Sequence, residues 1–516
     1  MNTYNQNLQL RVCGIKDEIP WLPGFILDLL EYLRCMESLE PAASEEEVLC
    51  EQCPVCLFET SSTSTSSSKS SKTSSDTEED GADFEWVRNI EDSAFVNLLL
   101  ETIDVDESYK SRVTVFHRTE GAYNHVVILA LDSQVRYVIK VPATGNEDEW
   151  HESDARQLRS EALLIKYIGM KTKVPVPEIF SWDDSSENCI GAPYILMSAL
   201  KGMPSHLFWM GKTPNGGLDD LNMDTPSPET GKKRRNFLKN LAYTMAELRT
   251  LEFDKIGMVH FDQDPSEENA VPPTVESFCV NNKDTPLVAY SSTSEFFDAR
   301  LADLLENIHK TAQEDDNELL NNLNYGTFSL YRFMCDSFAR SVKQGNEKES
   351  FVLAHNDLDF QNIWCNDQGE ITGIIDWEDT LTAPRSVGFA ALPLFLRTDW
   401  TNNYDMDDAW HMPWTLDPYR KFYAQCMHEA LNQDGNKPCG DAKYTLKSTL
   451  LCWAYDTVKR HERDNGDFID RLFKEIPNLR AVEPMKFLGR LGDERGFGTA
   501  EMMLPREFDA LFALKA

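Results

Sequence analysis

The sequence predicts an α+β protein with two lobes, a small lobe rich in β-strands followed by a mostly helical one. Two patterns support this prediction. Between residues 112 and 198, short β-branched and apolar runs alternate with turn residues, as in an antiparallel sheet. Beyond residue 198, long stretches place apolar residues at the spacing of amphipathic helices. With 516 residues, of which 41% are hydrophobic, the chain is long enough to fill both lobes.

The composition restricts the partners of this chain. Its formal net charge is −36 and its isoelectric point is near 4.6, so neither a nucleic acid nor an anionic membrane is the expected partner. The sequence contains no apolar run of 18 or more residues, so no membrane span is predicted. The start lacks the basic and apolar regions of a secretory signal. Twelve scattered cysteines fit reduced thiols better than a disulfide framework. We therefore expect a cytoplasmic protein.

The first part of the chain is expected to lie outside the two lobes. Residues 1–57 form an N-terminal extension, and residues 58–83 are a Ser/Thr-rich, acidic stretch that we interpret as a disordered linker, either phosphorylated or an unmodified tether. Cys50, Cys53 and Cys56 have a zinc-like spacing, but no fourth ligand follows nearby. Unpaired thiols are therefore the simpler interpretation.

The small lobe is predicted to span residues 84–198. Its first strands, residues 112–116 and 126–131, are joined by a loop that could fold over phosphates. This loop contains Gly121 but no G-x-G-x-x-G pattern, so by itself it is weak support for a nucleotide site.

A single lysine, Lys140, lies among apolar residues in the next predicted strand, residues 136–142. Such a lysine must either reach solvent or meet negative charge. Glu161 follows in a strong helical pattern, residues 158–165. Kinases use a Lys–Glu ion pair of this order to aim the lysine at the α- and β-phosphates of ATP, and we favour that interpretation over an exposed lysine and a solvated helix face.

The large lobe is predicted to span residues 199–516, with insertions near 203–230 and 258–292. Its basic run, residues 232–235, is interpreted as a solvated face, with a targeting signal as the alternative. Apolar periodicity predicts helices over residues 236–251, 294–308, 320–342, 419–431 and 444–460.

Within this lobe, residues 351–378 carry the chemistry. An apolar strand leads into a polar loop that contains His355, Asp357 and Asn362, and a second apolar strand ends at Asp376. The spacing is that of a kinase catalytic loop, H-x-D-x-x-x-x-N, followed by a metal-binding aspartate. Asp357 would accept the proton of a substrate hydroxyl, Asn362 and Asp376 would hold Mg²⁺, and His355 would support the loop.

These motifs resemble the aminoglycoside phosphotransferase-like kinases, and in particular their large fungal branch. The family shares the catalytic loop and a metal strand that ends in I-D-W, as residues 375–377 do here, and residues 378–400 are also similar. The resemblance begins near residue 110 and covers most of the chain after it. It implies a protein-kinase-like fold and leaves the substrate open.

The resemblance also implies an ATP-binding role for residues outside the catalytic loop. Gly121 and Asn124 would belong to the loop that covers the phosphates. The end of the fifth strand and the hinge between the lobes would meet the adenine through Met197, Ser198, Ala199 and Leu200. Because the chain is so acidic, we expect the phosphates to lie in a local basic island, with Mg²⁺ supplying further positive charge.

The sequence therefore predicts an ATP- and Mg²⁺-dependent phosphotransferase that acts on a hydroxyl of a small molecule. A protein-directed kinase is disfavoured because no A-P-E ending is present and Asp376 is followed by Trp-Glu instead of Phe-Gly. Kinases for choline, homoserine or a modified sugar amine are alternatives of the same fold. A catalytically silent pseudokinase that acts as an interaction module is disfavoured, because all the residues that catalysis needs are present: Lys140, Glu161, Asp357, Asn362 and Asp376.

Overall fold

The computed structural model describes most of the chain after residue 82. The described residues are 83–103, 107–132, 135–146, 148–211, 223–265, 272–279, 286–314, 317–343, 348–400, 404, 409–433, 439–460 and 466–514. The predicted N-terminal extension, almost all of the linker, and Cys50, Cys53 and Cys56 lie outside these residues. In the described residues, no helix combines the length and the apolar character that a membrane crossing requires.

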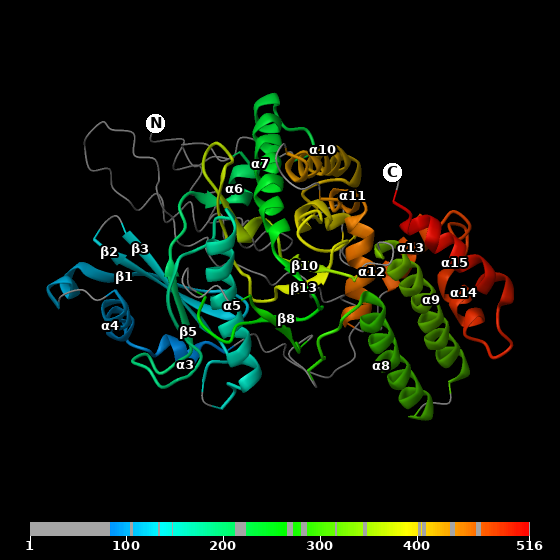
Figure 1. Ribbon diagram of the computed structural model, residues 1–516, viewed down its shortest axis with the longest axis horizontal. Coiled ribbons are helices and arrows are strands. Elements are labelled where there is room, and N and C mark those ends of the chain that lie inside the picture. Colours follow the sequence, from blue (N-terminus) through cyan, green and yellow to red (C-terminus); the bar gives the residue numbers. More distant parts are fainter. Residues whose placement is uncertain are drawn as a thin grey trace, which may run out of the picture.

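The small lobe is built on a five-stranded antiparallel sheet with the order β1-β2-β3-β5-β4. Its strands are β1 (Val113–Glu120), β2 (Asn124–Leu131), β3 (Val135–Pro142), β4 (Ile179–Asp183) and β5 (Tyr194–Ser198). The helix α5 (Glu152–Lys171) lies between the sheet and the helical lobe, and α4 (Asp92–Thr102), with the short α3 (Glu85–Arg88), lies on the outer side (Figure 1). The 3₁₀ turn η2 (Glu107–Arg112) contacts α4 and β1.

The alternation of side chains along β3 decides where its lysine points. Successive residues of a strand face opposite sides of the sheet. Ile139 and Val141 are buried in the cluster that contains α4, whereas Val138 is buried in the cluster that contains α5. Lys140 has the parity of Val138, and its partner across the sheet is Ile195 of β5. The strand therefore delivers Lys140 to the side of the sheet that faces α5 and the large lobe.

Two small sheets hold the catalytic stretch. The strand β10 (Phe351–Ala354) pairs with β13 (Leu381–Pro384) and β7 (Glu252–Phe253), and β11 (Ile363–Cys365) pairs with β12 (Ile371–Ile374) and β6 (Met203–Pro204). Between β10 and β11, the chain makes a loop that ends in the 3₁₀ turn η4 (Phe360–Asn362). A separate hairpin joins β8 (Met258–His260) and β9 (Thr274–Glu276). The catalytic loop thus leads into β11, which pairs with β12, the strand that precedes Asp376.

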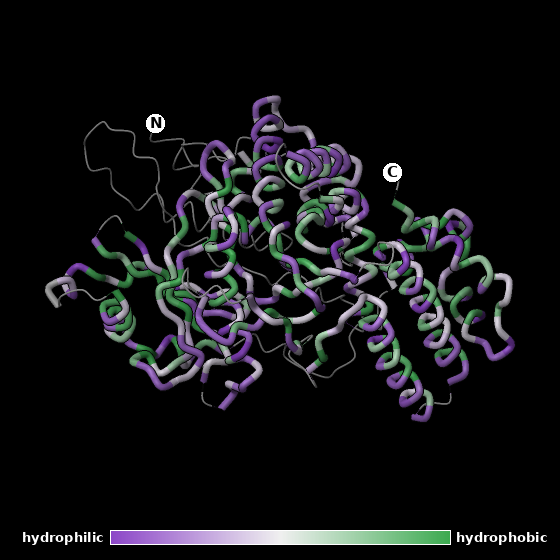
Figure 2. The backbone as a smooth tube through the Cα atoms, viewed as in Figure 1, coloured by the Kyte–Doolittle hydropathy of each residue, from purple (hydrophilic) through white to green (hydrophobic). Residues whose placement is uncertain are grey.

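Helices form the rest of the large lobe. They are α6 (Ser205–Trp209), α7 (Pro228–Ala246), α8 (Thr293–Glu314), α9 (Glu318–Val342), α10 (Pro413–Leu431), α11 (Ala442–Thr445), α12 (Ser448–Arg460), α13 (Gly466–Glu475), α14 (Pro484–Leu491) and α15 (Gly498–Phe512), with the 3₁₀ turns η3 (Glu247–Thr250), η5 (Leu394–Leu396) and η6 (Thr398–Trp400). In Figure 2, α8 and α9 alternate between hydrophilic and hydrophobic residues along their length, as amphipathic helices do. The predicted α+β, two-lobed, kinase-like fold class is confirmed.

Two features of the large lobe differ from expectation. No prediction covered α13, α14 and α15. Pro484 begins α14 and Pro505 lies inside the continuous helix α15, whereas proline usually marks a helix end. The basic run was expected on a solvated face, which is wrong for Arg234. Because α7 begins at Pro228, Arg234 lies inside the helix, is fully buried and donates hydrogen bonds to the carbonyls of Trp209 (2.9 Å) and Met223 (2.8 Å).

Candidate active site

His355 fastens the start of the catalytic loop. It is buried, and its Nε2 lies 2.9 Å from the carbonyl oxygen of Ile375, so Nε2 carries the proton and donates it. Its ring packs edge-on against Trp377 with centroids 4.7 Å apart. Burial lowers the pKa of His355, which keeps the imidazole neutral. His355 therefore ties the loop to the residue directly before Asp376.

Asp357 and Asn362 are joined by the turn at the end of the loop. The Asn362 amide nitrogen donates to the Asp357 carboxylate (2.7 Å) and to the Asp357 carbonyl (2.9 Å). The Asp359 carboxylate caps the same turn by accepting from the amide of Phe360 (2.7 Å). Because the Asn362 nitrogen is engaged, its amide oxygen is the atom that this side chain can offer to a cation.

Asp376 follows the end of β12 by two positions and has an unusual backbone conformation. Its φ is +63°, in the left-handed region that non-glycine residues rarely adopt. Its carboxylate Oδ1 lies 3.7 Å from the Lys140 Nζ atom. Burial raises the pKa of Asp376, and the Glu378 and Asp357 charges raise it further against the effect of Lys140. Strained backbone that aims a carboxylate at a buried cation is characteristic of functional sites.

Lys140 is surrounded by carboxylates. Its Nζ atom lies 2.9 Å from both Glu161 oxygens and 2.9 Å from Glu378 Oε2. Burial alone would lower the pKa of Lys140, but Glu161, Glu378 and Asp376 together raise it well above its usual value. Burial raises the pKa of Glu161 to about 7 although Lys140 opposes this shift. The expected basic island is thus wrong: one ammonium group contacts three carboxylates.

Glu378 links the two lobes, a role that sequence reasoning missed. From the large lobe it accepts a hydrogen bond from Lys140 and one from the Asn124 amide (3.3 Å), both of which belong to the small lobe. Burial would raise the pKa of Glu378, but Lys140 and Asn124 outweigh it and lower that pKa. The sequence signal was only its place two residues after Asp376.

The remaining predicted ATP-binding residues lie at the turn of the hairpin and at the hinge. The Gly121 amide donates to the Asn124 carbonyl (2.9 Å), which closes the turn between β1 and β2. Met197 is buried in β5, and Ser198 ends that strand. Within the described residues, no recorded interaction joins Met197, Ser198, Ala199 or Leu200 to Lys140 or Asp376.

Leu200 packs closely on the strand that leads to Asp376. A Cβ atom on Gly373 would lie 2.2 Å from Leu200 Cδ1, so a larger residue there would displace the Leu200 side chain. The Ala199 amide donates to the Arg136 carbonyl (3.2 Å). The hinge is therefore held against β3 on one side and β12 on the other.

The donor set suits Mg²⁺ bound together with phosphates. Asn362 and Asp376 offer hard oxygen atoms, and Mg²⁺ commonly takes one or two carboxylates with phosphate oxygens and waters. Among the residues that the structure describes, no group of three or more His, Cys, Asp or Glu side chains is arranged as a complete metal site. Phosphate oxygens would complete a site of this kind.

Comparison with known proteins identifies sequence relatives. The model of the phosphotransferase enzyme family matches residues 117–420, more than half of the chain. The chain is 22% identical over 327 residues to altered inheritance of mitochondria protein 9, mitochondrial, of Yarrowia lipolytica, covering 55% of this chain and 53% of that protein. It is 23% identical over 177 residues to the protein of the same name from Meyerozyma guilliermondii, covering 34% and 25%. The chain thus spans about half or less of these relatives.

Two solved structures with a similar fold are named as phosphotransferases. A ternary complex of aminoglycoside phosphotransferase APH(4)-Ia with AMP-PNP and hygromycin B is 14% identical, covers 81% of this chain and 97% of its own, and has a TM-score of 0.37. The macrolide 2′-phosphotransferase of Brachybacterium faecium is 14% identical, covers 76% and 99%, and has a TM-score of 0.36.

The relatives correct one prediction from the sequence. Both curated relatives carry the word mitochondrial in their names. This finding contradicts the cytoplasmic location that we expected from the composition. Net charge and cysteine usage separate intracellular from secreted proteins, but they do not distinguish one intracellular compartment from another.

Proposed function

Because the chain belongs to the phosphotransferase enzyme family, we propose that it transfers the γ-phosphate of ATP to a hydroxyl group of a small molecule with the help of Mg²⁺. One observation carries this proposal. Lys140 of the small lobe and Asp376 of the large lobe approach within 3.7 Å, next to the loop in which Asn362 holds Asp357. This is the set of groups that phosphoryl transfer requires.

The residues divide the work by their chemistry. Lys140, oriented by Glu161, binds the α- and β-phosphates, and Asn362 and Asp376 hold Mg²⁺. When bound, Mg²⁺ would neutralise charge on the phosphate oxygens. Gly121 and Asn124 cover the phosphates. The backbone at Ser198, Ala199 and Leu200, with Met197 behind it, receives the adenine.

Asp357 acts on the acceptor. It accepts the proton of the attacking hydroxyl, whose oxygen forms the new bond to the γ-phosphorus. The bond between that phosphorus and the β,γ-bridging oxygen breaks, and ADP leaves with its electron pair. His355 holds the loop so that Asp357 keeps its place.

A thermal-unfolding titration tests the nucleotide site. ATP with Mg²⁺, at about 100 times its Kd, should stabilise the protein by about 2.7 kcal/mol. Asp376→Ala should lose the part of this stabilisation that depends on Mg²⁺. Asp470→Ala, on the exposed side of α13, serves as the control for removal of a carboxylate. A wild-type response that is the same with EDTA, or an unchanged Mg²⁺ response in Asp376→Ala, would remove the metal site from the proposal.

A further inference from the structure

A small pocket lies directly beside the catalytic loop, on the side of the large lobe. His355, Asn356 and Leu358, which flank Asp357, line it from the loop. Its volume is about 40 Å³, which is room for roughly three water molecules. Apolar walls come from the segment after Asp376 and from α7 and include Phe389, Leu392 and Met245. The pocket suits a compact group more than a multi-ring molecule.

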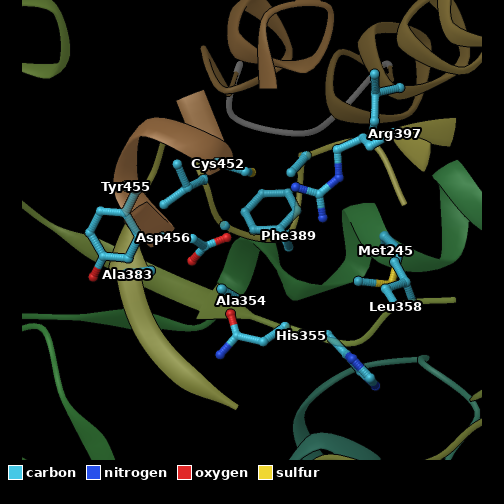
Figure 3. A pocket seen from close by; sticks show the side chains of 15 residues that line it. Met245, Ala354, His355, Leu358, Ala383, Phe389, Arg397, Cys452, Tyr455 and Asp456 are labelled. Atoms are coloured by element: carbon cyan, nitrogen blue, oxygen red, sulfur yellow. The ribbon is translucent and has the colours of Figure 1, made fainter. Parts of the chain in front are cut away.

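Two opposite charges line this pocket. Arg397 comes from the turn after η5, and Asp456 comes from α12. In Figure 3 the two side chains point toward the middle of the pocket, and the ring of Phe389 lies between them in that view. No ion pair joins Arg397 to Asp456, so the two charges are available to separate partners.

The guanidinium of Arg397 is unusually short of partners. Arg397 is 8% exposed, and its Nε atom has no hydrogen-bond partner in the described part of the chain. No geometric hydrogen bond or ion pair of its side chain is found among the described residues, although its charge acts on the Cys452 thiol and on the buried Asp359 carboxylate. A buried guanidinium usually meets a carboxylate or phosphate, because burial of an uncompensated charge is costly. The arrangement favours an anionic oxygen from outside the chain.

Asp456 is the complementary group. Lys459, one turn further along α12, is buried and lies near it, but no ion pair joins the two. Burial lowers the pKa of Lys459, against the effect of Asp456. Among the described residues, no hydrogen bond or ion pair of the Asp456 side chain is found, so its carboxylate can accept hydrogen bonds from an ammonium group.

We propose that this pocket binds the ammonium and carboxylate groups of a small hydroxylated zwitterion of the amino-acid type, with Arg397 on the carboxylate and Asp456 on the ammonium. The proposal rests on the proposed function. The hydroxyl arm of the ligand extends past Asn356 to Asp357, which takes its proton. The hydroxyl oxygen gains the γ-phosphoryl group, and ADP is released.

Binding of three matched probes tests the pocket in the full-length protein. L-serine carries both charges and a primary hydroxyl, ethanolamine lacks the carboxylate, and 3-hydroxypropionate lacks the ammonium. By calorimetry in the presence of ADP and Mg²⁺, L-serine should bind at least about tenfold more tightly than either analogue, because each charged hydrogen bond contributes to affinity. L-homoserine, whose side chain is one methylene longer, tests whether the hydroxyl needs a longer arm to reach Asp357.

Two variants assign the charges. Arg397→Gln should abolish the preference for L-serine over ethanolamine and keep the preference for L-serine over 3-hydroxypropionate. Asp456→Asn should keep the first preference and abolish the second. Arg506→Gln and Asp470→Asn, at exposed helical positions, should leave both preferences unchanged. Equal binding of both amino acids and the analogues, or preferences that neither pocket variant alters, would overturn the proposal.

Turnover separates this proposal from the proposed function. If L-serine or L-homoserine binds with the predicted variant pattern but no ADP or phosphorylated product forms, the pocket stands and the phosphotransferase activity fails. If ADP forms and phosphate passes to all probes with the same kcat/KM, the activity stands and the zwitterion pocket is overturned.

Discussion

The Lys140 site between the lobes and the pocket beside the catalytic loop differ in how their charges are paired. At the Lys140 site, the ammonium group of Lys140 is within 4 Å of three carboxylates, Glu161, Asp376 and Glu378. In the pocket, Arg397 and Asp456 have no ion-pair partner in the described chain, although Arg397 is as deeply buried as many core residues. The ammonium of Lys140 is paired with carboxylates of the protein itself, whereas the guanidinium of Arg397 has no such pair among the described residues.

This difference indicates where a ligand must compete with an ionic partner that belongs to the protein. Glu378 lies 2.9 Å from Lys140 Nζ. Under the proposed function, phosphate oxygens would need this position, so a nucleotide would have to displace Glu378 or share the site with it through Mg²⁺. A ligand in the pocket displaces no ionic partner of Arg397. Arg385, which is only twelve residues before Arg397, shows the contrast: it donates to both oxygens of the buried Asp441 (2.7 to 3.0 Å).

The largest effect is expected for Lys140→Met. Phosphoryl transfer should fall by about 10³-fold or more, because the main cation that would face the phosphates is lost. The variant should also be less stable, since Glu161 stays buried without its partner. In a double variant, Lys140→Met with Glu161→Gln, steady-state kinetics and chemical unfolding should show restored stability without restored transfer. Recovery of transfer would place the phosphates away from Lys140.

The two arginines should differ in their effect on folding. Arg385→Gln should lower the free energy of unfolding by about 3 kcal/mol, because it leaves the buried Asp441 carboxylate uncompensated. Arg397→Gln should change it by less than about 1 kcal/mol, since no ionic partner is orphaned. Urea unfolding measures both. A loss at Arg397 as large as that at Arg385 would mark Arg397 as a structural residue.

A buried histidine away from both sites, His411, should make the free energy of unfolding depend on pH. Trp209 Nε1 donates to His411 Nε2 (2.8 Å), so this imidazole is neutral. Burial lowers the pKa of His411 to about 4, while the unfolded value stays near 6.5. The unfolded state therefore binds more protons below pH 6.5, and stability falls as the pH falls from 6.5 toward 4.

Through this group alone, lowering the pH from 7 to 5 should cost about 2 kcal/mol of unfolding free energy, at 1.36 kcal/mol per pKa unit. His411→Gln should be less stable at pH 7 but should lose less on acidification. The comparison of urea midpoints at the two pH values isolates His411 from other titrating groups. An identical pH slope in the variant would mean that His411 is already charged in the folded protein.

The smallest effect is expected for Glu378→Gln. Removing the charge that competes for Lys140 should tighten ATP binding in EDTA by about fivefold, because the surplus negative charge around Lys140 is reduced. Calorimetry without Mg²⁺ measures this change. Weaker binding in the variant would mean that Glu378 positions Lys140 for the nucleotide instead of competing with it.

The sequence predicted the sheet and most helices because their local patterns agree with the fold. The parity of Lys140 in its strand and the five-residue spacing of Asp357 and Asn362 follow from one stretch of chain each. Contacts between distant segments could not be predicted. The link from Glu378 to Asn124, the burial of Arg234, and the seating of α14 on α9, where a Cβ at Gly326 would be 1.9 Å from Leu488 O, depend on tertiary packing.

The most direct test of the account is phosphate transfer by the wild-type protein and Asp357→Ala with ATP and Mg²⁺ over a panel of hydroxyl-bearing amines, amino acids and sugars. We expect the wild type to release ADP with at least one acceptor and to form its phosphate ester. Asp357→Ala should be slower by about 10² to 10⁴-fold with nucleotide binding intact. Wild-type turnover in Asp357→Ala, or no acceptor-dependent ADP release by the wild type, would contradict the account.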